Sequence, residues 1–382
     1  MIRNNKIMTK ANQTICVVSL LLLFGCSNHK NELRPNEKKK TFYVGTYTDG
    51  NSQGIYKYIL HDDGTLDKVG LMVKTENPSF IAKSADGNFI IAVNEISNKD
   101  NVGMVSSFSI EGDSLALIDQ SSSGGAHPCF VTINPDGYIL AANYTGGNVG
   151  LLRLEETGKL SNLLDIQQHT GSSITNRQQG PHAHSAWFSP GNNAVISVDL
   201  GTDELWFSTL DTLHQKLIPS KIKTLHMTPG AGPRHLAFHP DKKWIYVLNE
   251  LDGTITLVKQ NKDGIFEKKS SISSLPDGFK EPNNNADIHI SADGKFIYAS
   301  NRGHNSIAIL EVDKNNGVLK LIGHESTHGD GPRNFALSPD NNYLIVANQH
   351  SNNLVSFKID RNTGKLTFVG AVEAPTPVCI LF

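Results

Sequence analysis

The chain reads Pro233-Arg234-His235-Leu236-Ala237-Phe238-His239-Pro240-Asp241 and then Trp244-Ile245-Tyr246-Val247-Leu248-Asn249, and this stretch is the fullest copy of a repeat. Six related copies, the last of them incomplete, begin at Pro78, Pro128, His182, Asn285, Pro332 and Pro377. Successive copies start 50, 54, 51, 52, 47 and 45 residues apart. Short strands that are separated by Pro-Asp or Asp-Gly turns and recur at such a period are typical of propeller blades.

Each copy predicts two strands, and two more polar strands with alternating apolar residues follow, as at residues 254–259 and 266–272. The last copy, residues 377–382, stops after its first strand, whereas residues 41–46 form a second strand with no first strand before it. We therefore predict an all-β, seven-bladed β-propeller that is closed by pairing of the N- and C-terminal strands in one blade, without a disulfide. An open array of β-sandwiches is the alternative, but it does not account for the complementary ends.

The repeat fills residues 41–382, which we expect to form one domain. The N-terminus differs, because three basic residues precede an apolar run over residues 15–24 that is too short for a membrane helix of ~20 residues. Since Cys26 follows this run, the pattern resembles a bacterial lipoprotein signal. We predict a signal peptide over residues 1–25, a lipid on Cys26 and a flexible tether over residues 26–40. In the alternative, the signal is cleaved in the ordinary way and Cys26 is incidental.

This N-terminus predicts a protein of the cell envelope that is anchored by its lipid and faces the periplasm or the cell surface. Without residues 1–25 the chain has 32 basic and 37 acidic residues, so its formal charge is −5. That balance gives no sign of a nucleic-acid partner or of a membrane-binding surface beyond the lipid anchor. We expect a monomer. Cys129 and Cys379 belong to copies that are not adjacent, so we expect buried thiols and no disulfide between them.

Polar residues gather at two places in every copy. In a propeller, the start of the first strand and the end of the second strand of each blade open on the same face. The residues near the starts of the first strands are His127, His182, His184, Arg234, His235, Asp287 and Arg333. The second strands end in Thr46, Asn94, Asn143, Asp199, Asn249, Asn301 and Asn348, and these are followed by Tyr47, Glu95, Tyr144, Leu200, Glu250, Arg302 and Gln349. We expect the Asn, Asp and Thr side chains to bond the backbone where the chain turns.

Three arginines, Arg234, Arg302 and Arg333, are predicted to surround the mouth of the central channel. Such a cluster suits a carboxylate, a phosphate or an oxyanion that develops during a reaction. The alternative is that each guanidinium pairs with an acidic residue at a blade edge, such as Glu250, Asp287 or Asp199.

The histidines of Gly180-Pro181-His182-Ala183-His184 are spaced so that, on a strand, both imidazoles point to one side. A His-x-His pair can bind zinc, but no further ligand motif accompanies it, so we predict no metal and no cofactor. A neutral histidine near Glu250 can instead accept a proton from a water molecule at neutral pH. The alternative is a hydrogen-bonded histidine that lines the channel. The sequence has no Gly-x-Ser-x-Gly motif, so nothing supports a covalent serine mechanism.

The chain resembles the seven-bladed-propeller lactonase family, which includes the bacterial propeller type of 6-phosphogluconolactonase and the fungal carboxy-muconate lactonising enzymes. The resemblance covers residues 41–382 and is carried by residues 230–235, 247–251, 286–290 with 298–302, and 184–186 with 189–190. It implies a metal-free site at the channel mouth with His184, Arg234, Glu250 and Arg302 as the catalytic set. It also implies that Arg333 is a further pocket arginine. We add His182, His235 and Asp287 as expected substrate-binding residues.

We therefore expect a carboxylic ester hydrolase that opens a sugar lactone. The substrate is 6-phospho-D-glucono-1,5-lactone, hydrolysed to 6-phosphogluconate, or an unphosphorylated aldonolactone. The export signal is a departure from the family's cytoplasmic sugar-phosphate enzyme, so whether the substrate carries a phosphate stays open. Glu250 or His184 is expected to be the base, with Arg234 and Arg302 as ligands of the oxyanion or of a substrate acid. Two alternatives are a lactonising enzyme that acts on an unsaturated diacid and a non-catalytic propeller that binds a carbohydrate or a protein.

Overall fold

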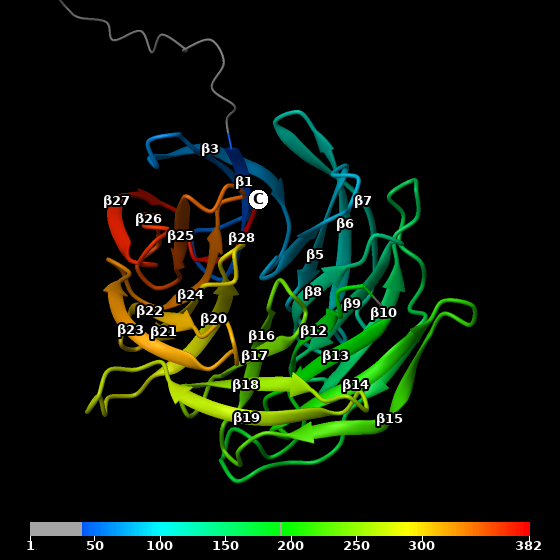
Figure 1. The fold of residues 1–382 in the computed structure, drawn as a ribbon. Helices are drawn as coiled ribbons and strands as arrows, with labels where there is room; N and C mark the ends of the chain where they lie inside the picture. The colour runs from blue at the N-terminus through cyan, green and yellow to red at the C-terminus, as the bar shows by residue number, and fades with distance from the viewer. Residues whose placement is uncertain (1–39, 192) are drawn as a thin grey trace, which may run out of the picture. The chain divides into compact units, whose positions relative to one another are not determined.

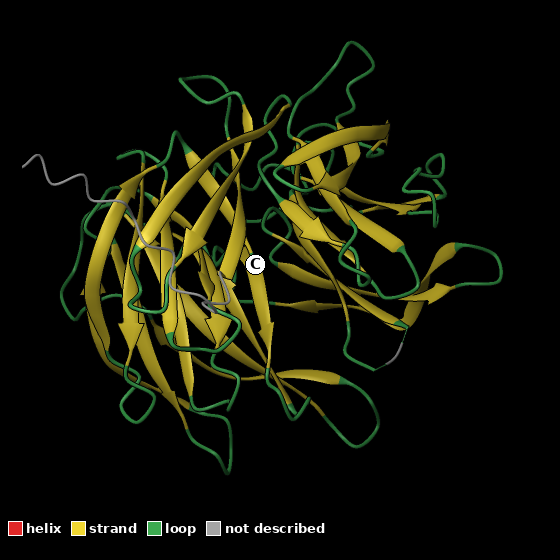
Figure 2. Ribbon diagram, turned by 90° about the horizontal axis from the view of Figure 1, so that it is seen from above, coloured by secondary structure: helices red, strands yellow, loops and turns green. Residues whose placement is uncertain are grey.

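The computed structural model describes residues 40–191 and 193–382. In this part of the chain, the strands form seven four-stranded antiparallel sheets, which we number as blades 1 to 7 (Figure 1). Each first strand lies nearest the centre of the ring, and each starts at or within a few residues of a predicted repeat start. Figure 2 shows strands and loops throughout and no helix. No described segment is a helix long and apolar enough to cross a membrane. The predicted propeller is confirmed.

The strand bounds, blade by blade and from the innermost strand outward, are as follows. Blades 1 and 2 contain β28 (Pro377–Leu381), β1 (Lys40–Thr46), β2 (Gly54–Leu60) and β3 (Leu66–Lys74), then β4 (Ile81–Lys83), β5 (Phe89–Asn94), β6 (Met104–Glu111) and β7 (Ser114–Ser122). Blades 3 and 4 contain β8 (Pro128–Ile133), β9 (Tyr138–Asn143), β10 (Asn148–Arg153) and β11 (Asp165–Gln168), then β12 (Ala183–Phe188), β13 (Ala194–Asp199), β14 (Glu204–Asp211) and β15 (Lys216–His226). Blade 5 contains β16 (Pro233–Phe238), β17 (Trp244–Asn249), β18 (Thr254–Gln260) and β19 (Phe266–Ser273). Blades 6 and 7 contain β20 (Asn284–Ile290), β21 (Phe296–Arg302), β22 (Ser306–Val312) and β23 (Leu319–Ser326), then β24 (Pro332–Leu337), β25 (Tyr343–Asn348), β26 (Asn353–Ile359) and β27 (Leu366–Glu373).

The two ends of the described chain close the ring within blade 1. β28 pairs antiparallel with β1, so that Val44 lies opposite Ile380, and β28 also contacts the neighbouring inner strands β4 and β24. The last residue of the predicted tether belongs to the sheet instead, because Lys40 pairs with Leu60 and its ammonium group lies 2.9 Å from Asp62, while residues 26–39 of that tether lie outside the described residues. The predicted signal peptide, residues 1–25, and the predicted lipid on Cys26 lie outside the described residues.

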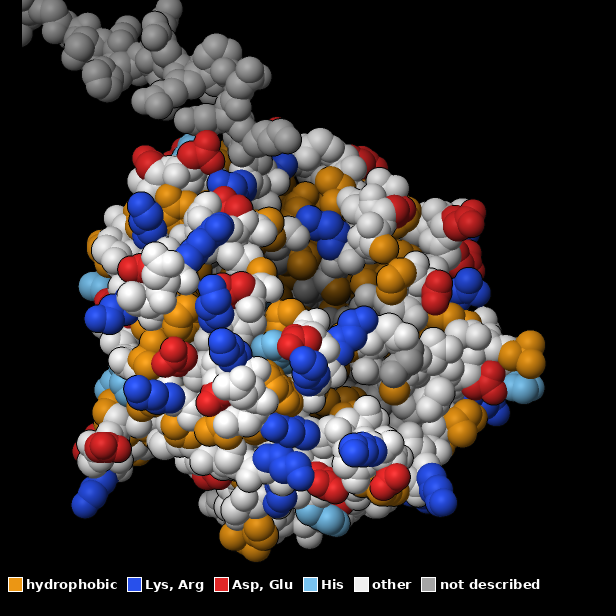
Figure 3. All heavy atoms as spheres, in the orientation of Figure 1, with side chains coloured by type: hydrophobic (Ala, Val, Ile, Leu, Met, Phe, Trp, Pro, Cys, Tyr) orange, Lys and Arg blue, Asp and Glu red, His pale blue; other side chains and the backbone are white. Residues whose placement is uncertain are grey.

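Buried apolar side chains form one cluster at each of the seven blade interfaces of the described ring. The second strand of each blade contributes side chains to two of these clusters, as β17 shows. Side chains alternate between the two faces of a strand, and both faces of β17 are covered by a neighbouring blade. Ile245 and Val247 therefore pack against blade 4, while Tyr246 and Leu248 pack against blade 6. This is why the second strands read as continuous apolar runs. Figure 3 shows one face of the ring, hollowed at its centre.

Turns of one blade also fit against aromatic residues of the preceding blade. Gly317, in the turn between β22 and β23, has φ of +73°, and a Cβ atom there would lie 2.5 Å from the Trp244 ring. The Tyr246 hydroxyl donates to the Gly317 carbonyl at 3.0 Å. Gly364 repeats the arrangement against Phe296 and Tyr298 in the next blade. Glycine is required at such a turn both by its positive φ and by the close approach of the ring.

Three asparagines at the ends of second strands join their blade to the one before it. Asn143 donates to the Ser123 carbonyl at 2.9 Å, Asn301 to the Ser274 carbonyl at 3.0 Å, and Asn348 to the Thr327 carbonyl at 2.9 Å. Each acceptor directly follows the outermost strand of the preceding blade. These side chains bond the backbone as predicted, but the carbonyls belong to the preceding blade and not to the turn after the second strand, so the bonds connect neighbouring blades.

The two described cysteines are free and buried. Cys129 lies in β8 of blade 3 and Cys379 in β28 of blade 1, with blade 2 between them. The prediction of separate buried thiols is confirmed.

Replacing Asn301 with alanine is expected to lower the free energy of unfolding by about 1–3 kcal/mol, because the buried Ser274 carbonyl and hydroxyl each lose one of their hydrogen-bond partners. Urea denaturation followed by tryptophan fluorescence measures this as a lower midpoint. The control is Asn362→Ala, which changes an exposed asparagine in the turn between β26 and β27. Equal midpoints for the two variants would contradict a stabilising role for the bond between blades.

Candidate active site

A pocket of about 230 Å³ lies where the first strands begin and the second strands end. It takes residues from blades 2 to 7 and from the segment between blades 3 and 4. The lining residues are Glu95, Cys129, Tyr144, Arg177, His184, Glu250, Asn284, Arg302 and Arg333. His184, Glu250, Arg302 and Arg333 are therefore brought together as predicted from the sequence. Arg234 lies next to them, against Glu250.

Small irregularities of the inner strands position several of these side chains. The register of β12 shifts at His184, that of β16 at Arg234 and that of β24 at Arg333. A β-bulge of this kind inserts one residue into a strand and re-aims its side chain. The second source of pocket residues is the position directly after a second strand, which contributes Glu95, Tyr144 and Glu250.

The Glu250 carboxylate is the centre of the site. Its Oε2 atom lies 3.0 Å from Arg234 Nε and 3.0 Å from Arg302 Nη2, and its Oε1 atom lies 3.1 Å from Arg177 Nη2. The Glu250 side chain is only 5% exposed. The alternative raised from the sequence, in which arginines pair with an acid at a blade edge, thus holds for Arg234 and Arg302. Both use the same acid.

These ion pairs set the protonation state of Glu250. Burial raises the pKa of its carboxyl, but the charges of Arg302, Arg234, Arg177 and Arg333 outweigh burial and bring the pKa to about 2. The carboxylate is therefore ionised at neutral pH. A carboxylate with so low a pKa is a weak acceptor of protons.

His184 is the buried imidazole of the pocket. Its Nδ1 atom lies 3.7 Å from the Cys129 sulfur, and its ring stands nearly perpendicular to the ring of Tyr144. Burial lowers the pKa of His184 well below its usual value of 6.5, and the charges of Arg234, His235 and Arg333 lower it further. The imidazole is thus neutral at neutral pH and retains one nitrogen lone pair that can accept a proton.

Arg333 differs from the other pocket arginines in its partners. It donates to the Tyr47 hydroxyl at 2.7 Å and lies over the Tyr47 ring, and Tyr47 in turn donates to Glu95 at 2.8 Å. Among the ion pairs of residues 40–191 and 193–382, none includes Arg333. Burial lowers the pKa of Arg333, but Tyr47, Glu95 and Glu250 reverse this and raise it. It is a fixed positive charge that can still receive an anion.

Arg177 and Tyr144 form a second pair of the same kind. Arg177 Nη2 donates to the Tyr144 hydroxyl at 2.9 Å as well as contacting Glu250. The Arg177 side chain is 45% exposed, unlike that of Glu250, so it covers the outer side of the pocket.

Residues 169–182, between β11 and β12, carry Arg177, and buried polar contacts anchor this segment. Gln178 donates to the Leu200 carbonyl at 2.8 Å and to Asp203 at 2.7 Å, while Ser173 donates to Asp203 at 2.5 Å. His169 lies 2.7 Å from Asp199, and both side chains are fully buried. Arg177 is therefore presented from a fixed segment.

Sequence reasoning missed Arg177 because it lies in a linker outside the repeated motif. The signal that could have drawn attention to this linker is its length, since the step of 54 residues from Pro128 to His182 is the longest between successive copies. Tyr144, Glu95 and Tyr47 were placed at the correct face by their position after a second strand, but no role was assigned to them.

Three expected substrate-binding residues do not line this pocket. The His182 ring stacks on the Tyr144 ring, whereas His184, at the register shift of β12, lines the pocket. His235 lies 2.9 Å from Asp287, and both side chains are buried beside Arg234. Burial and the charge of Arg234 bring the pKa of His235 to about 4, although Asp287 opposes this shift. These residues hold the lining residues and do not face the space themselves.

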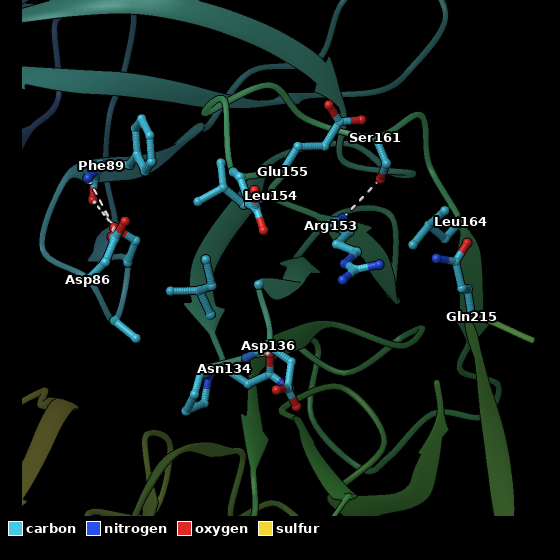
Figure 4. A pocket seen from close by; sticks show the side chains of 16 residues that line it. Asp86, Phe89, Asn134, Asp136, Arg153, Leu154, Glu155, Ser161, Leu164 and Gln215 are labelled. Atoms are coloured by element: carbon cyan, nitrogen blue, oxygen red, sulfur yellow. Dashed lines mark hydrogen bonds between the residues drawn. The ribbon is translucent and has the colours of Figure 1, made fainter. Parts of the chain in front are cut away.

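A larger cavity of about 640 Å³ lies at the opposite ends of the strands of blades 2 and 3 (Figure 4). Two of its polar side chains, those of Asp86 and Asn134, accept hydrogen bonds within their own turns. Asp86 accepts from Ser84 at 2.5 Å, and Asn134 accepts from the Tyr138 backbone at 2.8 Å. Figure 4 shows Asp86, Asp136 and Arg153 well apart from one another around it. It therefore lacks the convergent charges of the Glu250 pocket.

Among the described residues, no group of three or more His, Cys, Asp or Glu side chains is arranged to hold a metal ion. Counted together with Arg234, the lining residues of the Glu250 pocket supply four guanidinium groups, two carboxylates, one imidazole, one thiol, one phenol and one amide.

Comparison with known proteins gives a consistent result. The family described as "Lactonase, 7-bladed beta-propeller" matches residues 41–382. A Bacillus subtilis protein named 6-phosphogluconolactonase is 35% identical over 77% of this chain and 83% of its own length. A crystal structure from Bacteroides fragilis, titled a putative 6-phosphogluconolactonase, is 32% identical with a TM-score of 0.83, and the match covers 91% of this chain and 99% of that one.

A third similar protein is the Pseudomonas aeruginosa periplasmic gluconolactonase, which is 30% identical with a TM-score of 0.84 over 89% of this chain and 98% of its own. The repeat, the closed ring of seven blades and the match over residues 41–382 agree. The chain belongs to the seven-bladed β-propeller lactonase family.

Proposed function

We propose that the protein is a carboxylic ester hydrolase that opens the ring of a sugar lactone. The observation that carries the proposal is the combination of a neutral buried imidazole, His184, with a group of arginines held around one ionised carboxylate. Lactone hydrolysis needs a group that takes a proton from water and positive charge where the carbonyl oxygen becomes an anion. The names of the Bacillus subtilis and Pseudomonas aeruginosa relatives support the same chemistry.

In this mechanism His184 accepts a proton from the water that attacks the lactone carbonyl. The carbonyl π electrons move to oxygen, and the guanidinium of Arg302, with Arg234 beside it, stabilises the oxyanion. Glu250 fixes the arginines in place. Of the two bases considered from the sequence, the low pKa of Glu250 favours His184. We assign His182, His235 and Asp287 a positioning role, since each contacts a pocket residue or the support of one.

Arg333 is proposed to bind an anionic group of the substrate. Four arginines against two glutamates leave the pocket with excess positive charge when His184 is neutral, and Arg333 has no ion-pair partner among the described residues. A phosphate or a carboxylate would complete it. We therefore favour 6-phospho-D-glucono-1,5-lactone or a lactone of similar charge. An unphosphorylated aldonolactone would place a hydroxyl group there.

We further propose that the protein acts as a monomer in the cell envelope, held by a lipid on Cys26. The signal-like residues 1–25 support this proposal, as does the similarity to a protein that is titled periplasmic. Mass spectrometry of the membrane fraction tests it, because a lipidated protein would begin at a diacylated Cys26.

Arg302→Gln is expected to lower kcat for glucono-1,5-lactone and its 6-phosphate by about 10²-fold or more, because a donor to the oxyanion is lost. Acid release in a pH-stat, corrected for spontaneous hydrolysis, measures the rates. The matched control is Arg153→Gln, an exposed arginine at the larger cavity, which should keep wild-type activity. If the wild-type protein accelerates neither reaction but binds a sugar or a protein at the pocket, the non-catalytic propeller replaces this proposal. If the wild-type protein instead cyclises an unsaturated diacid, the lactonising enzyme replaces this proposal.

Arg333→Gln is expected to raise KM for the 6-phosphorylated lactone about 10-fold to 100-fold and to change KM for the unphosphorylated lactone much less, because only the former loses a charge-assisted contact. Steady-state kinetics with both substrates measure the difference. An equal effect on the two lactones would show that Arg333 does not bind the phosphate group.

The rate should remain high as the pH falls through 6.5, the usual pKa of histidine, and decline only in more acidic solution. The reason is that a lowered pKa keeps His184 unprotonated until the solution is more acidic. The profile of kcat/KM between pH 4 and pH 7 measures this. An acidic limb centred at pH 6.5 or higher would exclude His184, in this environment, as the essential base.

A further inference from the structure

Two tyrosine hydroxyls meet an arginine at this site, and the fate of their protons differs. Tyr47 accepts from Arg333 and donates its own proton to Glu95 at 2.8 Å. Tyr144 accepts from Arg177 at 2.9 Å, and no described residue accepts the Tyr144 proton. Because an arginine can only donate, the hydroxyl hydrogen of Tyr144 is left for another acceptor. Tyr144 lines the pocket, so that acceptor is a bound molecule or water.

We propose that Tyr144 is the general acid of the lactonase reaction and protonates the ring oxygen as it leaves the carbonyl carbon, with Arg177 as its positioning residue. This inference rests on the proposed function. The Tyr144 ring centroid lies 5.6 Å from that of His184. A base for the water and an acid for the ring oxygen must lie this near to each other, since the two oxygens bond to the same carbon.

The electron and proton balance is complete with these two residues. His184 takes one proton from water while the water oxygen bonds to the carbonyl carbon, and the tetrahedral anion then collapses. The bond from carbon to the ring oxygen breaks, its electron pair stays on that oxygen, and the Tyr144 proton moves to it. The tyrosinate accepts its hydrogen bond from the Arg177 cation. Transfer of the proton from His184 through solvent to Tyr144 restores the enzyme, and the product is the open hydroxy acid.

The other donors of the pocket fit this task less well. Arginine does not release its proton in a protein. The Cys129 thiol points to the His184 carbonyl at 3.4 Å, and burial raises its pKa. Tyr47 is bound to Glu95. The main rival is His184 itself, which could return to the ring oxygen the proton it took from water. In that case Tyr144 would have no part in the chemistry.

Support for the Tyr144 ring comes from two sides. The Tyr144 ring stacks on the His182 ring, with 4.5 Å between centroids and 12° between planes. His182 Nδ1 also lies 3.0 Å from the backbone carbonyl oxygen of Tyr144. Its hydroxyl is fixed by Arg177, which the anchored segment 169–182 presents. Burial raises the pKa of Tyr144 although Arg177 opposes this, so the phenol keeps its proton at neutral pH.

The test compares D-glucono-1,5-lactone with 5-thio-D-glucono-1,5-lactone, whose shape is nearly the same. A thiolate leaves without a proton, because a thiol has a pKa of about 8.5, far below that of an alcohol. Tyr144→Phe should lower kcat for the lactone by about 10²-fold or more and for the thiolactone by less than about fivefold, with little change in KM. Arg177→Gln should show the same preference to a smaller degree, and Arg177→Lys should recover part of the loss.

Two controls complete the experiment. Tyr47→Phe removes the hydroxyl of the matched pair, and we expect it to change KM without distinguishing the two leaving groups. Tyr43→Phe, in the apolar cluster between blades 1 and 2, should leave the rates unchanged. Equal losses of Tyr144→Phe on both substrates would reduce Tyr144 to a positioning residue, and wild-type rates would favour the rival with His184 alone. Both results overturn the inference while the lactonase function stands. That function fails only if the wild-type protein hydrolyses no lactone.

Discussion

The ion-paired carboxylate of Glu250 is the constraint on which the rest of the site depends. A single buried acid is shared by Arg234 from blade 5, Arg302 from blade 6 and Arg177 from the segment between blades 3 and 4. Burying a charge is costly unless it is paired or hydrogen-bonded, and removing one partner of a buried ion pair typically costs about 3–5 kcal/mol. Three separate parts of the chain must therefore be in place together before the pocket acquires its electrostatic character.

The propeller makes this convergence possible at low conformational cost. Every blade brings the start of its first strand and the end of its second strand to the same face, and the inner strands contact their neighbours around the whole ring. The apolar clusters between blades and the asparagine bonds at the strand ends fix the blades rigidly enough to hold side chains within hydrogen-bond distance of one another. Pre-organised charge of this kind stabilises a developing anion without rearrangement during the reaction.

The pocket is divided into two arginine–tyrosine pairs with different surroundings. In the Tyr47–Arg333 pair, Glu95 uses the phenol proton and the guanidinium has spare donors, which suits recognition of an anion. In the Tyr144–Arg177 pair, Glu250 occupies the guanidinium and the phenol proton is free. One pair is thus organised to bind and the other to donate, although both are made from the same residue types. The His184 imidazole lies beside Tyr144 and requires neither metal nor covalent intermediate in the mechanism proposed above.

The sequence by itself determined the seven blades, the closure of the ring by residues 41–46 and 377–382, and the face that carries the site, because the period and the strand ends are local properties. For the same reason it located His184, Glu250, Arg302 and Arg333 at the pocket. Only the tertiary structure decided which side chains face the space. Bulges in the inner strands shift the register at His184 and Arg234, and His184 lines the pocket, whereas His182 stacks on Tyr144 and His235 is buried with Asp287 beside Arg234. Arg177 could not be placed at all, since the position of a linker residue follows from contacts such as Gln178 with Asp203 that no repeat pattern encodes.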